Sequence, residues 1–168
     1  MPTGLKQTSS VVPIGFAVAE TAPNTFAQGQ IDLNLSPLDR EVFVVLAVNL
    51  DSDVPETIAG TNTAVRAALT TTSQTALPSL QDANCLARLS HFTNADATMA
   101  VGYSSQALET PPSTLEYIGI IATNDFFVQI QGTNNVGISG VSGKMYGYRA
   151  VASADIYAAL VQSEVLSA

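Results

Sequence analysis

Short segments in which apolar and polar residues alternate recur along most of this chain, and they limit its possible folds more than any other feature. Residues 26–35 and 84–93 show the alternation, and segments at 97–104, 114–122 and 125–131 repeat it. Successive side chains of an extended strand point to opposite faces, so a period of two is typical of strands with one buried face. The sequence therefore predicts a chain built mainly of β-strands.

Two segments lack a simple alternation. Residues 41–50, EVFVVLAVNL, form an apolar run rich in β-branched residues, which fits a central strand buried on both faces. Residues 63–75 are ambiguous, because Thr70-Thr71-Thr72 favours a strand whereas Ala64 to Leu69 favours a helix. Both alternatives remain open for this second segment.

The period changes from two to 3.6 after the last expected strand, residues 143–152. Ser153 is a suitable N-cap, and Asp155 lies in the first turn, where the helix dipole favours a negative charge. One stripe of the expected helix carries Ile156, Tyr157, Leu160, Val161 and Val165. We expect this stripe to pack on the protein's own sheets, with a neighbouring subunit as the alternative.

Seven or eight short strands followed by one helix predict an all-β fold. The expected architecture is an antiparallel β-sandwich or jelly roll of about eight strands with one C-terminal α-helix. Residues 26–152 would form the sandwich and residues 153–168 the helix, while Asn124-Asp125 would make a tight hairpin turn. Residues 1–25 are rich in Thr, Ser and Pro and are expected to form a flexible arm that orders on contact.

The composition favours a protein that is covered by other copies of itself. Only 12% of the residues are charged, about half of the roughly 25% that is usual for soluble domains. Charged residues are depleted at the centres of protein–protein interfaces. We therefore expect a subunit of an assembly, kept soluble before assembly by its net charge of −8.

The charge pattern also disfavours nucleic acid and membranes as direct partners. The six Lys and Arg residues are dispersed along the sequence, whereas contacts to phosphate backbones use clustered cations. No apolar run reaches the length of a membrane-spanning helix. We expect neither direct nucleic-acid binding nor insertion into a membrane.

Reactive side chains are few. A nucleophilic triad would need the single histidine, His91, but its neighbour Ser90 points to the opposite face of an extended strand. The single cysteine, Cys85, excludes an intrachain disulfide and is expected to be a small buried apolar residue. We expect no enzymatic activity and no cofactor.

Three acidic residues near the end of one strand form a weak candidate cation site. Asp51, Asp53 and Glu56 have a spacing that offers oxygen ligands to a hard cation such as Ca²⁺. The sequence lacks the glycine and closing glutamate of a calcium-binding loop, so a solvated turn is the expected alternative. No metal site is assigned here.

Candidate interface residues come from three parts of the chain. Tyr146 and Tyr148 would share one strand face beside Arg149, and Tyr and Arg are enriched at interfaces, although a solvated face with tyrosines is an equal alternative. The arm and the helix would supply the remaining contacts. The full set of candidates is Val11, Val12, Ile14, Phe16, Tyr146, Tyr148, Arg149, Tyr157 and Val161.

The Thr/Ser/Ala/Val-rich body, the low charge and the ending GKMYGYRAVASADIYAALVQSE give residues 25–168 the overall character of a small virion protein. The chain resembles single jelly-roll capsid proteins of tailless icosahedral viruses of bacteria and archaea. This resemblance implies a self-assembling shell subunit, made in the host cytoplasm and located in the virion, with its own copies and other virion proteins as partners. The alternatives are a head-decoration protein, a carbohydrate- or receptor-binding β-sandwich, and a small β-barrel enzyme using carboxylates.

Overall fold

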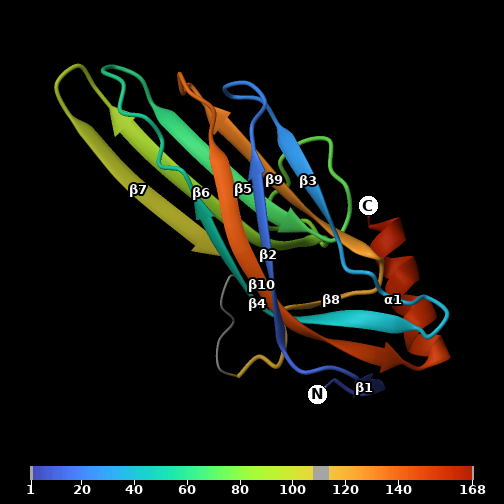
Figure 1. Ribbon diagram of the computed structural model, residues 1–168. Helices are drawn as coiled ribbons and strands as arrows, with labels where there is room; N and C mark the ends of the chain where they lie inside the picture. Colours follow the sequence, from blue (N-terminus) through green and yellow to red (C-terminus); the bar gives the residue numbers. More distant parts are fainter. Residues whose placement is uncertain (1, 108–113, 168) are drawn as a thin grey trace.

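The computed structural model describes residues 2–107 and 114–167, which form two antiparallel sheets and one helix (Figure 1). Sheet A contains β1 (Leu5–Gln7), β2 (Val12–Ala19), β4 (Glu41–Ser52), β8 (Gly119–Ile121) and β10 (Gly140–Ala152). Sheet B contains β3 (Ala27–Asp32), β5 (Thr63–Thr70), β6 (Cys85–Ala95), β7 (Ala100–Ala107) and β9 (Asp125–Thr133). The helix, α1, spans Ala154–Leu166.

The strand pairing follows one long hairpin that is rolled up on itself. β2 pairs with β10, β3 with β9, β4 with β8, and β5 with β6, so the pairs are nested from the ends of the chain towards its middle. Rolling this hairpin also brings β10 beside β4 and β9 beside β5. The arrangement is that of a jelly roll, with β7 added beyond β6 at the edge of sheet B.

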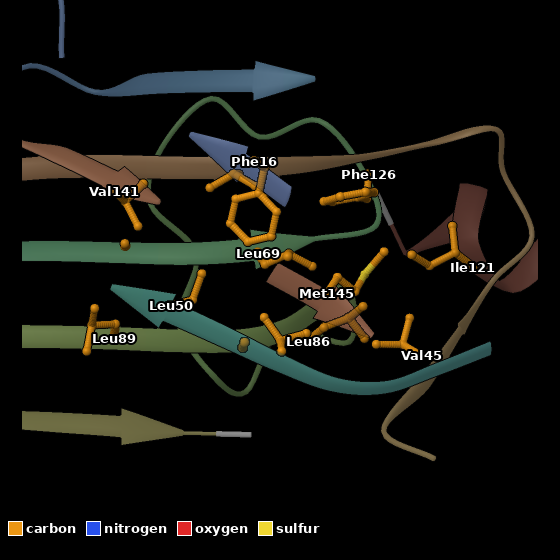
Figure 2. Close-up of a cluster of buried hydrophobic side chains, with 14 of the residues drawn as sticks. Phe16, Val45, Leu50, Leu69, Leu86, Leu89, Ile121, Phe126, Val141 and Met145 are labelled. Carbon is orange, nitrogen blue, oxygen red and sulfur yellow. The ribbon is translucent and has the colours of Figure 1, made fainter. Parts of the chain in front are cut away.

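The main core lies between the two sheets and is apolar throughout (Figure 2). A β-bulge in β4 helps to fill it, because the pairing with β10 shifts between Tyr146 and Gly147 and leaves one extra residue in β4. Phe43 and Val45 enter the core before the bulge, and Val48 enters it afterwards. A bulge moves the strand's alternation by one residue, so both halves of β4 face sheet B.

A second apolar cluster lies on the opposite face of sheet A. It contains Val42, Val44, Tyr148 and Ala150, and four residues of α1 pack against it: Ile156, Tyr157, Leu160 and Val161. The Ser153 hydroxyl oxygen accepts a hydrogen bond from the Ile156 backbone N–H at 3.5 Å, which confirms the predicted N-cap. The helix therefore docks on its own sheet, although Val165, predicted on the same stripe, is 59% exposed.

The expectation of a flexible arm over residues 1–25 is wrong for most of that segment. β1 pairs with residues 150–152 of β10 and β2 pairs with residues 140–147, so both are strands of sheet A. Phe16 of β2 is 8% exposed and packs edge-to-face on Phe126, with ring centroids 5.9 Å apart. Burial of this ring stabilises the pairing. The outermost residues of the predicted arm and helix, 1 and 168, lie outside the described residues.

The predicted hairpin turn at Asn124-Asp125 is also wrong. β8 belongs to sheet A and β9 to sheet B, so the turn connects the two sheets instead of joining paired strands. The Asn124 side-chain oxygen accepts a hydrogen bond from the Leu35 backbone N–H at 2.6 Å, and its carbonyl accepts one from Leu33 N–H at 2.8 Å. The ambiguous segment after residue 62 is strand β5.

Candidate functional site

The structure separates the predicted interface residues of β10. Tyr148 is 7% exposed and lies in the cluster beneath α1, where burial raises the pKa of its hydroxyl. Tyr146 is half-buried, and α1 covers neighbouring parts of the same sheet face through Tyr157 and Val161. Tyr148, Tyr157 and Val161 therefore pack within the subunit.

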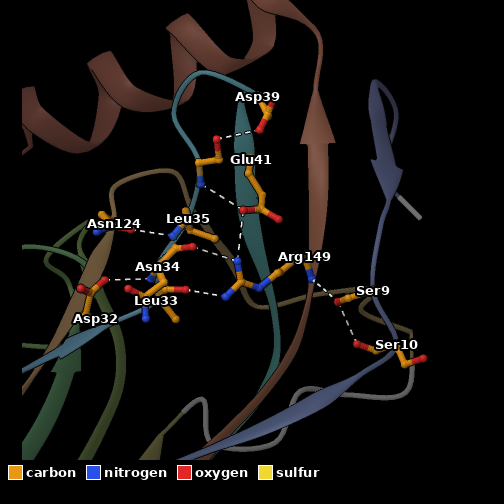
Figure 3. A network of polar contacts seen from close by, with 11 residues as sticks. Ser9, Ser10, Asp32, Leu33, Asn34, Leu35, Asp39, Glu41, Asn124 and Arg149 are labelled. Atoms are coloured by element: carbon orange, nitrogen blue, oxygen red, sulfur yellow. Dashed lines mark hydrogen bonds and ion pairs between the residues drawn. The ribbon is translucent and has the colours of Figure 1, made fainter.

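Arg149 holds the connection between β3 and β4 against sheet A (Figure 3). Its guanidinium forms an ion pair with Glu41 at 3.1 Å and donates hydrogen bonds to the carbonyls of Leu33 at 2.7 Å and Asn34 at 3.0 Å. Glu41 also accepts a hydrogen bond from the Ser36 backbone N–H at 3.0 Å. Arg149 thus has a structural role that its sequence context did not indicate.

The four candidates in β2 and directly before it differ in exposure. Val11 and Val12 are 51% and 38% exposed, Ile14 is partly buried against the main core, and Phe16 lies inside it. The first two remain available to a partner. Ile14 and Phe16 instead contribute to the core of the subunit.

Asp53 and Glu56, two of the candidate cation ligands, bind backbone N–H groups of the loop between β9 and β10 and of Gly140, the first residue of β10. Glu56 accepts hydrogen bonds from Val136 at 2.6 Å and Gly137 at 2.9 Å, one to each carboxylate oxygen. Asp53 accepts one from Gly140 at 2.8 Å. Hydrogen bonds between carboxylates and N–H groups are stronger than neutral ones, so these residues clamp a loop.

Glu20 also binds backbone groups at the two ends of this loop. The residue is 3% exposed, and its carboxylate accepts hydrogen bonds from the backbone N–H groups of Gly132 at 2.6 Å and Ser139 at 2.9 Å. Asn24 adds two hydrogen bonds to the backbone of Asn135, at 2.8 and 2.9 Å. The loop is therefore held rigidly although its Val136 and Ile138 side chains are 76% and 57% exposed.

Asp51, the third candidate ligand, is exposed on β4 and lines an open hollow together with Asp53 and Ser142. Within residues 2–107 and 114–167, no group of three or more His, Cys, Asp or Glu side chains is arranged to hold a metal ion. Cys85 is a free, buried thiol as expected, and burial raises its pKa.

The exposed edge of β7 is the least protected part of the described molecule. Natural proteins protect edge strands with charged residues, proline or very short length. β1 and β8 have three residues each, β2 contains Pro13, and β3 ends at Asp32. β7 has eight residues and lies in the uncharged, proline-free stretch 97–108, at the side of the molecule away from α1 (Figure 1).

An aromatic row leads across the outer face of sheet B to this edge. The rings of Phe92 on β6 and Tyr103 on β7 are stacked, with centroids 5.0 Å apart and planes 22° apart. The Arg66 guanidinium on β5, the other neighbour of β6, lies over the Phe92 ring, 5.0 Å from its centroid. Tyr103 is 51% exposed, and Met99 and Val101 beside it are 69% and 61% exposed.

The alternation of residues 97–104 predicts a strand here, but it does not predict the row of side chains on three strands that forms this surface. The signal was present, because Met99, Val101 and Tyr103 alternate within a stretch that lacks charge. Two buried acidic residues had no comparable signal in the sequence: Glu20, and Glu164 of α1, whose carboxylate accepts a hydrogen bond from the backbone N–H of Ala122. Neither has another charged residue close by in sequence, and the backbone groups that they bind are far away along the chain.

No family model, curated protein or solved structure matches this chain significantly. None of the described helices is long and apolar enough to span a membrane.

Proposed function

We propose that this protein is a structural subunit of a virus particle that assembles into a shell through contacts between copies. The jelly-roll order of the strands supports this proposal, since the fold is used by viral capsid proteins, although lectin domains and cupins use it as well. Fold alone does not assign a function, and the surface of the protein supplies the further support.

The observation that carries the proposal is a set of apolar side chains that are exposed on a hydrogen-bonded loop and on an edge strand with its preceding turn. Val136 and Ile138 project from the clamped loop, and Met99, Val101 and Tyr103 project from β7 or the turn before it. Apolar side chains held in place on rigid elements lose little conformational freedom when a partner covers them. Such a surface suits binding to another protein.

The low charge of the chain supports contacts between identical copies, because charged groups are costly to bury at the centre of an interface. Net charge −8 argues against a surface that lines a nucleic-acid genome and favours the outer or middle part of a shell. We therefore place the protein in the virion, with its own copies and other virion proteins as partners and no direct contact to nucleic acid.

Light scattering of the purified protein over a series of protein and salt concentrations, combined with negative-stain imaging, tests the proposal. We expect discrete oligomers or closed shells that become more abundant at higher salt, because salt screens the repulsion between acidic subunits. A monomer at every concentration and salt level contradicts self-assembly. Binding of that monomer to preformed shells would then identify a decoration protein.

A carbohydrate-binding role is the second candidate, and the exposed ring of Tyr103 beside Phe92 and Arg66 favours it. Aromatic faces and a neighbouring guanidinium are suited to stacking and hydrogen bonding with a sugar. Glycan-array binding that is lost in Tyr103→Ala, while the protein stays monomeric, would support this role. A blank array removes it.

A further inference from the structure

We propose that two copies of this chain pair through β7, antiparallel and across a two-fold axis that passes beside Tyr103, so that two B sheets become one continuous sheet. This inference rests on the proposed function, since it names one of the contacts through which copies assemble. The proposal is based on two features that lie together: β7 is an uncharged edge strand, and its central residue, Tyr103, is the last member of a row of stacked side chains.

The backbone of β7 provides the first part of the argument. β7 pairs with β6 on one side, and no described strand pairs with its other side. Every second N–H and C=O group of an edge strand points away from its sheet, where another strand can pair with it. β7 is longer than β1 or β8 and lacks the proline of β2 and the aspartate of β3.

Charge explains why a second copy is a suitable partner at this edge. The protein carries a net charge of −8, so most pairs of surfaces on two copies repel each other. Residues 97–108 carry no charge, and two copies can therefore approach along β7 without placing acidic side chains opposite one another.

Symmetry limits the possible registers. An axis perpendicular to the sheet keeps each side chain on its own face, so residues that lie opposite each other must come from the same face of β7. Tyr103 opposite itself satisfies this condition and overlaps nearly all of β7. In this register Gly102 lies opposite Ser104, and Val101 lies opposite Ser105.

The side chains favour this register over the one centred on Ser104. Neighbouring strands lie about 4.8 Å apart, and the observed Phe92–Tyr103 stack has a centroid distance of 5.0 Å. A second Tyr103 would occupy the corresponding place on the free side of the first. The resulting row is Arg66, Phe92, Tyr103 and then the same three residues of the second copy in reverse order.

The ends of this row carry the two Arg66 guanidinium groups, far from the axis, so the like charges do not meet. One pair of eight-residue strands forms less contact than a standard interface of about 800 Å² per partner. We therefore expect the contact to be weak in an isolated pair and to be reinforced by other contacts in a complete assembly.

Disulfide trapping tests the register. Gly102→Cys and Ser104→Cys are made separately, each with Cys85→Ser to remove the native thiol. A Cβ at Gly102 has Phe92 O as its nearest neighbour, at 3.7 Å, so the backbone accommodates the change. Directly opposed Cβ atoms of paired strands are about 4.5–5.5 Å apart, close to the spacing that a disulfide bridges.

We expect a crosslinked dimer when the two variants are mixed under oxidising conditions and none when either is oxidised alone. Crosslinking of Ser104→Cys by itself would place Ser104 on the axis and overturn the proposed register. No crosslinking in any sample, under conditions in which the wild type assembles, overturns the pairing of β7 with itself.

A charge variant tests the interface without a thiol. Tyr103→Lys places two ammonium groups opposite each other at the axis, and we expect loss of the assembled species seen for the wild type. Leu38→Lys is the matched control, because Leu38 is 94% exposed in the turn before β4, and it should assemble normally. Tyr103→Phe keeps the ring and should also assemble, and thermal unfolding checks that every variant is folded.

The outcomes distinguish the two proposals. A wild-type protein that never assembles overturns both the proposed function and this contact. The contact alone is overturned if the wild type assembles, the Tyr103→Lys variant assembles equally well, and the mixed Gly102→Cys and Ser104→Cys variants do not crosslink. The proposed shell function is then unaffected.

Discussion

The carboxylate of Glu164 in α1 accepts a hydrogen bond from the backbone N–H of Ala122, at 2.8 Å, and this contact ties the helix to the end of β8. The same oxygen accepts a second hydrogen bond from Thr123 N–H at 3.1 Å, and the other oxygen accepts one from the Thr123 hydroxyl at 3.2 Å. Glu164 is 7% exposed. The helix is therefore positioned by a buried acidic side chain as well as by its apolar stripe.

Glu164→Ala is expected to lower the free energy of unfolding by about 1–3 kcal/mol, because it leaves buried N–H groups without an acceptor. Glu164→Gln keeps an amide oxygen for these groups and should lose much less. Urea unfolding at neutral pH measures both variants. Equal losses for Ala and Gln would show that the hydrogen bonds to Ala122 and Thr123 do not hold the helix.

The pH dependence of stability provides a second test of Glu164. Burial raises the pKa of its carboxyl above the ordinary value, more than its hydrogen bonds lower it. The folded protein therefore binds this proton more tightly than the unfolded chain does. As a result, the contribution of Glu164 to the free energy of unfolding decreases as pH rises from the ordinary pKa of the unfolded chain to the raised pKa of the folded protein. We expect Glu164→Gln to gain stability relative to the wild type over that interval. A difference that does not vary with pH contradicts the raised pKa.

Arg149→Met removes an ion pair with Glu41 and hydrogen bonds to two carbonyls. The side chain is 35% exposed, so water compensates in part, and we expect a loss of about 1–2 kcal/mol in the free energy of unfolding. Lys144→Met, an exposed change on the same strand, is the control and should alter stability by less than about 0.5 kcal/mol. Similar losses for both variants would contradict the structural role of Arg149.

Phe16→Ala tests whether β2 is part of the folded core. The ring is buried between the sheets against Phe126, and its removal should cost about 3–5 kcal/mol. Val11→Ala, at an exposed position just before β2, should change stability by less than about 0.5 kcal/mol. If residues 1–25 were a flexible arm, both variants would unfold at the wild-type denaturant concentration.

Gly147→Ala tests the close approach of β10 and β4. A Cβ at Gly147 would collide with the backbone carbonyl of Val44 and the ring of Phe43, neither of which can move freely in the core. We expect a loss of about 1–3 kcal/mol. Gly102→Ala is the matched control, since its Cβ would have only ordinary contacts. Urea unfolding measures both variants, and a wild-type midpoint for Gly147→Ala as well as for Gly102→Ala would argue against this packing.

Much of the secondary structure was predictable because it depends on local patterns. The alternation identified the strands at 26–35 and 84–93, and the apolar β-branched run identified the strand at 41–50. The change of period with Ser153 located the start of α1. The predicted all-β sandwich with a terminal helix is confirmed. The burial of Cys85 was also predictable, because a single small apolar thiol is usually buried.

The candidate surface was harder to predict because its parts come from different strands. Alternation told us that Val101 and Tyr103 share a face, but not that their strand lies at the edge of a sheet or that Phe92 and Arg66 extend the row. Arg149 was predicted at an interface because Tyr and Arg are enriched there. Its actual carbonyl partners, Leu33 and Asn34, are more than a hundred residues away in sequence, so no local pattern indicated them.

Local patterns in the chain show which residues alternate, where the period changes and how few residues are charged. They do not show which strands are neighbours, that the first strands belong to sheet A, or that Asp53 and Glu56 bind backbone groups. Side-chain alternation depends on each residue's immediate neighbours in sequence, whereas strand pairing and the burial of Phe16 depend on distant segments that meet when the long hairpin rolls up.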